Sequence, residues 1–175
     1  MDVRFESVHP HDAADPTLRA QLLALWVAAT DAGGAVGFTA PAPVDHIAAA
    51  LAEALGRVAA GTDSLGILRR DDVVVGMGFL VDRGALLTRH WRTVLRVMVD
   101  PSIQGSGAGT VLMRGLHAVA VDLGLEQLQL TTRDGHDLEV FYERFGYTVV
   151  GRHPGAVRVA PGDDRDEIMM VARLA

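Results

Sequence analysis

A glycine-rich segment is the part of this sequence best suited to bind a ligand. Residues 104–109 read Gln-Gly-Ser-Gly-Ala-Gly and stand between an apolar run at residues 94–99 and a helix-like run that begins at Thr110. Glycines let consecutive main-chain N–H groups approach an anion closely, and the N-terminus of the following helix carries roughly +0.5 of a unit charge. The segment therefore predicts a cradle for a pyrophosphate group.

Other phosphate-binding and nucleophile motifs do not fit this segment. A P-loop needs a lysine beside its last glycine, and the chain has no lysine. A dinucleotide fingerprint has the spacing Gly-x-Gly-x-x-Gly after the first strand of a parallel sheet, whereas Gly105, Gly107 and Gly109 alternate. Ser106 does not stand in the Gly-x-Ser-x-Gly pattern of a nucleophile elbow. Taken alone, the segment is equally consistent with a plain strand-to-helix turn.

The residue types that are missing exclude several chemistries. The 175 residues include no cysteine, lysine or asparagine. Disulfides, thiolate nucleophiles, cysteine metal sites and Schiff-base lysines are therefore excluded. The formal charge of −6 and the lack of a basic cluster argue against a nucleic-acid partner. No apolar run is long enough for a membrane span or a signal peptide, so we expect a cytoplasmic protein without a membrane partner.

The spacing of apolar residues predicts alternating strands and helices in a chain short enough for one domain, residues 1–175. Asp15 and Pro16 predict the start of the first helix, because they offer a capping oxygen and a preset φ. The expected helices are residues 16–33, 44–61, 108–123 and 137–145. The expected strands are residues 3–5, 65–69, 73–81, 94–99, about 128–130, 147–151 and 168–172. This order predicts an α/β (α+β) fold in which helices cover a mixed sheet.

Three features together resemble the GCN5-related N-acetyltransferase (GNAT) superfamily. Residues 104–109 match its Gln/Arg-x-x-Gly-x-Gly/Ala signature, residues 97–101 resemble the end of its fourth strand, and residues 141–147 look like its Tyr-Glu-x-x-Gly-Phe segment. Residues 34–38 and 151–155 look similar to small-molecule acetyltransferases of the tabtoxin resistance type. The resemblance implies a single-domain GNAT fold: a mixed, mostly antiparallel sheet of six to seven strands flanked by about four helices.

The resemblance also implies a cofactor site and a catalytic residue. In that superfamily the loop N–H groups hold the pyrophosphate of acetyl-CoA, and the pantetheine arm pairs with the fourth strand. The residues that match these contacts are Val97, Met98, Val99, Gln104, Gly105, Ser106, Gly107, Ala108, Gly109 and Thr110. Tyr142 matches the general acid that would protonate the departing thiolate. A tyrosine on this apolar helical stripe is also consistent with simple packing.

Two features of the superfamily are missing here. Gly135 stands where an asparagine often binds the pantetheine arm, and the fourth strand has no acidic residue before Asp100. The general base is therefore unassigned. Residues expected near the right strand ends are His90, Asp134, His136 and Glu139, each of which is also typical of a turn, a cap or a solvated surface. A chain of waters is an equal alternative.

Phe38 and Trp91 are the predicted substrate contacts, although either is also consistent with the core. The acidic run at residues 163–167 would attract a cationic amine, but a solvated charge run is the simpler interpretation. The histidines lack the spacing of metal ligands, and no metal site is predicted.

The expected function is therefore that of an acetyl-CoA-dependent N-acetyltransferase. It would transfer the acetyl group to the primary amine of a small amino-acid-like, antibiotic-like or toxin-like molecule, by direct attack in a ternary complex. Two alternatives stay open: an acyl-CoA-binding regulatory protein without catalysis, and a protein or peptide N-acetyltransferase. The identity of the amine, the use of other acyl groups and the formation of a homodimer also stay open.

Overall fold

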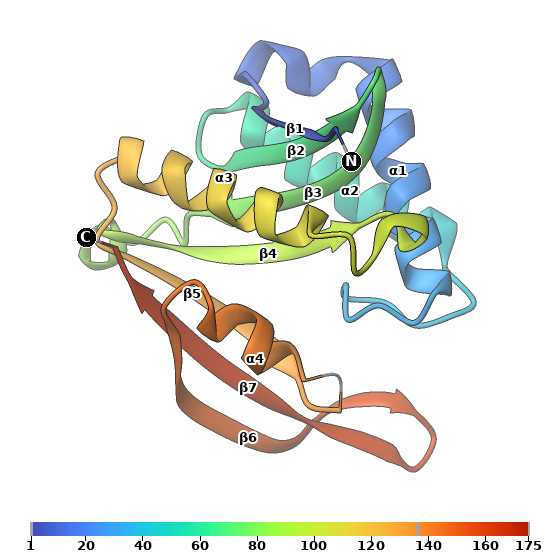
Figure 1. Cartoon of the computed structure of the whole chain (residues 1–175), viewed down its shortest axis with the longest axis vertical. Helices are drawn as coiled ribbons and strands as arrows, with labels where there is room; N and C mark the ends of the chain where they lie inside the picture. Colours follow the sequence, from blue (N-terminus) through green and yellow to red (C-terminus); the bar gives the residue numbers. More distant parts are fainter. Residues whose placement is uncertain (1, 136, 175) are drawn as a thin grey trace.

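The structure is a computed structural model, and it describes residues 2–135 and 137–174. In this part of the chain, seven strands form one twisted sheet in the order β1-β2-β3-β4-β5-β7-β6. Helices lie against both faces of the sheet (Figure 1). His136, one of the predicted base candidates, lies outside the described residues.

The strands are β1 (Arg4–Ser7), β2 (Ser64–Arg70), β3 (Val73–Val81), β4 (Trp91–Val99), β5 (Gln127–Arg133), β6 (Tyr147–Ala160) and β7 (Asp163–Arg173). The α-helices are α1 (Pro16–Asp31), α2 (Val44–Ala59), α3 (Ala108–Asp122) and α4 (Leu138–Glu143). Short 3-10 helices are η1 (Pro10–Ala14), η2 (Leu86–Thr88) and η3 (Pro101–Ile103). Of the helices in the described residues, none is both long and apolar enough to cross a bilayer.

The strand directions confirm the predicted fold class. All neighbouring strands are antiparallel except β4 and β5, which are parallel. The start of α1 also agrees with the sequence, because the Asp15 carboxylate accepts a hydrogen bond of 2.8 Å from the N–H of Thr17. The sheet is therefore mixed and mostly antiparallel, as expected.

Two apolar clusters cover the two faces of the sheet. One lies under α1 and α2 and includes Trp26, Leu22 and Phe79. The other lies under α3 and includes Leu112 and Leu116. Because β2 and β3 are covered on both faces, their sequences are almost continuously apolar rather than alternating.

The last two strands are longer than the sequence predicts. They were expected at residues 147–151 and 168–172, but β6 and β7 continue into a long hairpin. Arg158 and Asp164 lie opposite each other in this extension, with Arg158 Nε 2.6 Å from a carboxylate oxygen of Asp164. Charges that pair across two strands support a hairpin. The acidic run at residues 163–167 by itself is typical of a solvated loop, which is why the prediction ended too early.

Candidate functional site

β4 and β5 are joined at one end only. Their parallel register runs from Trp91, opposite Gln127, to Thr93, opposite Gln129. Beyond Thr93 the two strands diverge (Figure 1). Within the described residues, the edge of β4 that faces β5 therefore has no strand partner after Thr93. The result is a wedge in the middle of the sheet with main-chain hydrogen-bonding groups along one side.

A β-bulge lies where β4 leaves β5. Met77 pairs with Met98 and Phe79 with Leu95, so two residues of β4, Arg96 and Val97, oppose the single Gly78 of β3. A bulge bends its strand and increases the local twist. A Cβ on Gly78 would lie 2.7 Å from a methyl carbon of Leu116, so this close packing of α3 on the bulged sheet requires glycine.

The glycine segment follows the open end of β4. Gly105 and Gly107 have φ angles of 76° and 93°, in the left-handed region that favours glycine. In the described part of the chain, the N–H groups of Gly105 and of residues 107–109 have no hydrogen-bond partner. The N-terminus of α3 lies in the same place and adds its partial positive charge. These donors fit the predicted pyrophosphate.

Two members of the predicted set use their N–H groups inside the turn. The N–H of Thr110 donates to the carbonyl oxygen of Gly107 at 3.0 Å, and that of Ser106 donates to Ile103 at 3.3 Å. These two amides hold the shape of the turn, while the other amides of the segment are available to a ligand.

A cavity of about 720 Å³ connects the wedge with the glycine segment, and we call it the wedge cavity. Most of the predicted cofactor contacts line it together with Tyr142: Val97, Met98, Val99, Gln104, Gly105, Gly107, Gly109 and Thr110. Ser106 and Ala108 are not among its lining residues. The structure thus brings the strand, the loop and the tyrosine to one place.

Tyr142 borders the wedge cavity from α4. Its ring packs edge-on against Phe141 and Tyr147, with ring centres 5.1 Å and 5.8 Å apart. The Tyr147 hydroxyl lies 3.3 Å from Nε2 of His117, whereas the Tyr142 hydroxyl has no hydrogen-bond partner among the described residues. Burial raises the pKa of Tyr142 to about 12, so the phenol keeps its proton at neutral pH. Tyr142 can therefore donate a hydrogen bond or a proton into the cavity.

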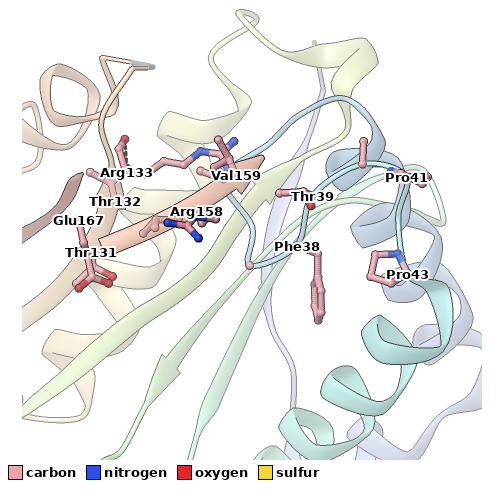
Figure 2. A pocket seen from close by; sticks show the side chains of 14 residues that line it. Phe38, Thr39, Pro41, Pro43, Thr131, Thr132, Arg133, Arg158, Val159 and Glu167 are labelled. Carbon is pink, nitrogen blue, oxygen red and sulfur yellow. Dashed lines mark hydrogen bonds between the residues drawn. The ribbon is translucent and has the colours of Figure 1, made fainter. Parts of the chain in front are cut away.

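A second cavity of about 590 Å³ adjoins the first, and we call it the loop cavity. The two share Ala35, Gly37, Thr131 and Thr132. Figure 2 shows Phe38 and its loop on one side of the loop cavity and residues of β5, β6 and β7 on the other. Phe38 also packs on Trp26, with ring centres 5.8 Å apart. It is therefore both a packing residue and a wall of the cavity.

Three hydrogen bonds hold the loop between α1 and α2 in place. Trp26 Nε1 donates to the carbonyl oxygen of Val36 at 2.9 Å, and the N–H of Ala42 donates to the Asp31 carboxylate at 2.7 Å. Arg133 reaches across from β5 and donates to the carbonyl oxygen of Gly33 at 2.9 Å. The loop is therefore held near both of its ends, at Gly33 and Ala42, and within its length at Val36.

The acidic run of β7 is largely neutralised by intramolecular ion pairs. Asp163 pairs with Arg165, Asp164 with Arg158, and Asp166 with Arg152. Glu167 lines the loop cavity and has no ion pair among the described residues. The sequence alone did not distinguish Glu167 from the other acidic residues of this run. The ion pairs of the folded hairpin show that Glu167 is the carboxylate without an arginine partner in the described residues.

The other predicted residues lie outside the two cavities or already have partners. Trp91 stands at the closed end of β4, where the Arg83 guanidinium lies 5.3 Å from the centre of its ring, and it lines neither cavity. His90 precedes it and is exposed. Asp134 accepts a hydrogen bond from the N–H of Asp166 at 3.0 Å, and Glu139 lies 3.8 Å from Arg152. In the described residues, no group of three or more His, Asp or Glu side chains is placed to hold a metal ion.

A model of the acetyltransferase (GNAT) family matches residues 40–147 of the chain. The matched region extends from Ala40 to Tyr147 and includes the bulged strand, the glycine segment and Tyr142. It covers more than half of the sequence and most of the residues that line the wedge cavity.

Solved structures share the fold over nearly the whole chain. A putative phosphinothricin N-acetyltransferase has a TM-score of 0.79 at 15% identity and covers 99% of each chain. The putative acetyltransferase yncA from Salmonella typhimurium, solved with acetyl-CoA, has a TM-score of 0.76 at 18% identity and covers 100% of this chain and 95% of the other. The ribosomal-protein-S18-alanine N-acetyltransferase from Escherichia coli has a TM-score of 0.74 at 15% identity and covers 99% and 95%. At these identities the likeness shows the fold.

Proposed function

The chain belongs to the acetyltransferase (GNAT) family and is an acetyl-CoA-dependent N-acetyltransferase, and we propose that its acyl acceptor is the primary amine of a small, amino-acid-like molecule. The observation that carries this proposal is the loop cavity, which adjoins the wedge cavity and is covered by an anchored loop. Its volume of about 590 Å³ lies within the range of roughly 300–1,000 Å³ typical of small-molecule sites.

The wedge cavity is the proposed acetyl-CoA site. The N–H groups of Gly105 and of residues 107–109 would hold the pyrophosphate, and the unpaired edge of residues 97–99 would hold the pantetheine arm in the manner of an added strand. Acetyl-CoA, when bound, supplies the activated acetyl thioester. The side chains along this edge matter little to such contacts, because the main chain makes them.

Glu167 is our proposed binding residue for the acceptor amine. Its carboxylate lines the loop cavity without an ion pair in the described chain, so it can attract an ammonium group and accept its proton directly or through water. The neutral amine then forms the amide bond as the carbon–sulfur bond breaks. An amine that kept its proton would have no lone pair with which to attack.

Tyr142 is our proposed general acid. Tyr142 lines the wedge cavity. Its hydroxyl keeps its proton because burial raises its pKa, and it has no competing partner among the described residues. It can donate that proton, or a hydrogen bond, to the sulfur that leaves. Glu167 would thus accept the proton that the amine loses, and Tyr142 would donate the proton that the thiolate gains.

A thiol-release assay with acetyl-CoA tests the proposal. Small primary amines, amino acids included, are expected to be acetylated with a higher kcat/KM than peptides with the same N-terminal residue. Asp31→Ala removes one anchor of the covering loop and serves as the matched variant, which should raise the relative use of peptides. Preferential acetylation of peptides by the unchanged protein, with mass spectrometry locating the acetyl group, would contradict a small-molecule acceptor.

A further inference from the structure

Arg96 occupies a strained position on the wall of the wedge cavity. It is the first residue of the β4 bulge and has a φ of 55°, a left-handed conformation that is costly for a residue with a Cβ. Its guanidinium carbon lies 4.7 Å from the centre of the Trp26 ring and 5.8 Å from that of Phe79. Backbone strain of this kind is concentrated at functional sites, so we expect Arg96 to have a role in function.

No carboxylate pairs with this guanidinium. Arg96 is half-buried, yet within the described residues it has no hydrogen bond and no ion pair. Glu53 and Asp63 favour its charge only at longer range, and Asp63 is already held by Arg57 at 2.7 Å. Other arginines of the chain do pair with carboxylates: Arg4, Arg57, Arg69, Arg92, Arg152, Arg158 and Arg165.

Packing alone does not explain an arginine here. An aliphatic side chain of similar length would fill the space between Trp26 and Phe79 without removing a charge from water. Burial lowers the pKa of Arg96, which reports this desolvation, although the guanidinium stays charged at neutral pH. A half-buried charge that meets aromatic rings but no carboxylate and no hydrogen-bond acceptor is costly unless a ligand supplies the acceptor.

We propose that Arg96 binds a carboxylate of the acyl acceptor, which would make the acceptor an amino acid rather than a simple amine. This inference rests on the proposed function. A guanidinium fork matches a carboxylate in bidentate geometry, and aromatic walls restrict its rotation. A carboxylate held at the bulge fixes the acceptor beside the open edge of β4, and because the two cavities share Thr131 and Thr132, the amine of the same molecule can extend toward Glu167.

The first test compares substrates that differ only in this charge. Common α-amino acids and their α-amides are assayed with acetyl-CoA for the unchanged protein and for Arg96→Gln and Arg96→Lys. The unchanged protein should prefer the acids by about 10- to 100-fold in kcat/KM, the effect expected of a charged hydrogen bond. This preference should collapse in Arg96→Gln and be only partly kept in Arg96→Lys. Equal use of acids and amides by the unchanged protein would overturn the proposal.

The second test measures binding without turnover. In a Trp91→Phe background, Trp26 is the remaining tryptophan, and its emission should respond to whatever contacts the neighbouring guanidinium. Acetate is the probe, with acetamide and chloride as controls. A saturable response to acetate alone, lost in Arg96→Gln of unchanged melting temperature, supports the site; an identical response in Arg96→Gln, or none in either protein, rejects it.

The two tests separate the two ideas. A response to acetate without acetylation of any small amine would leave the anion site standing and reject the proposed function. Acetylation of acids and amides at equal rates, with no response to acetate, would leave the proposed function standing and reject the role of Arg96. If the melting temperature of Arg96→Gln is lowered, Arg96→Lys replaces it in the binding test, because lysine keeps the positive charge and lacks the planar guanidinium fork. The response to acetate is then expected to be weaker in Arg96→Lys than in the unchanged protein.

Discussion

The indole N–H of Trp26 donates a hydrogen bond of 2.9 Å to the carbonyl oxygen of Val36. The same buried ring has Phe38 packed against it and the Arg96 guanidinium near its centre. One core side chain therefore connects α1 with the covering loop and with the bulge of β4. A change at Trp26 should affect both stability and the acceptor site.

Trp26→Phe is expected to destabilise the protein and to raise the KM for the acceptor. It removes the bond to Val36, worth about 1 kcal/mol net, and leaves a space where the larger ring packed. Thermal melting and steady-state kinetics measure the two effects. Trp91→Phe is the matched control, since Trp91 borders neither cavity, and it should leave the KM unchanged. Equal KM values for the two variants would contradict this role of Trp26.

Gly107→Ala is expected to weaken acetyl-CoA binding by about 10-fold or more, measured by calorimetry. A Cβ at a φ of 93° is strained by roughly 1–2 kcal/mol, and relief of that strain would move the N–H groups of residues 107–109. Gly61→Ala is the control, because Gly61 follows α2, has a φ of 72° and lies outside both cavities. It should cost similar stability and leave the affinity intact. Equal affinity losses in both variants would indicate a general folding defect instead.

Tyr142→Phe is expected to lower kcat by about 100-fold, the usual scale for a lost general acid, and to leave acetyl-CoA affinity nearly unchanged. The phenyl ring keeps the packing against Phe141 and Tyr147 and removes only the hydroxyl. Rapid mixing separates the chemical step from product release. Full turnover in a folded Tyr142→Phe protein would remove this hydroxyl from the mechanism.

The raised pKa of Tyr142 also predicts a loss of stability at high pH. In the unfolded chain the phenol titrates near 10, and in the folded chain at about 12, so the folded state disfavours the phenolate. The stabilisation is complete below about pH 10 and is lost as the pH rises toward 12. Denaturant titrations across this window should show a shallower decline for Tyr142→Phe. Parallel curves for the two proteins would be inconsistent with a buried phenol.

Glu167→Gln is expected to lower kcat/KM for amine acceptors by about 100-fold, because the amide can neither take the proton nor attract the ammonium group. Acetyl-CoA affinity, measured separately, should not change. Asp164→Asn is the control from the same acidic run, since its carboxylate faces Arg158 and lines neither cavity. Similar kinetic losses in both variants would point to the charge of the hairpin as a whole.

The glycine segment could be predicted from its own residues, and Tyr142 and the strand contacts from the resemblance to the superfamily. The glycine segment, the strand before it and Tyr142 are close in sequence to the elements that position them, and they line one cavity. The mostly antiparallel directions of the strands were expected from the resemblance to the superfamily, whereas most helix bounds followed from local signals. Such features depend on backbone conformation and apolar spacing, both of which are written in short windows of the sequence.

The roles proposed for Arg96 and Glu167 could not be predicted from the sequence, for a different reason. Arg96 is the one charge in the apolar run at residues 94–99, and Glu167 is one of several acidic residues in the run at residues 163–167. What distinguishes them is that neither has an ion pair among the described residues, whereas the acidic neighbours of Glu167 pair with arginines of the same hairpin. The lone arginine inside the run at residues 94–99 was the one available signal.

The short seam between β4 and β5 has a mechanical consequence. In the described chain, the pairs from Trp91 to Thr93 are the strand pairing that joins β1 to β4 with β5 to β7, so the two parts of the sheet are hydrogen-bonded to each other over a short stretch. A ligand bound between the two parts of the sheet would restrict their motion relative to each other. Amide hydrogens of β5 and β7, far from the glycine segment in sequence, should then exchange more slowly once acetyl-CoA is bound.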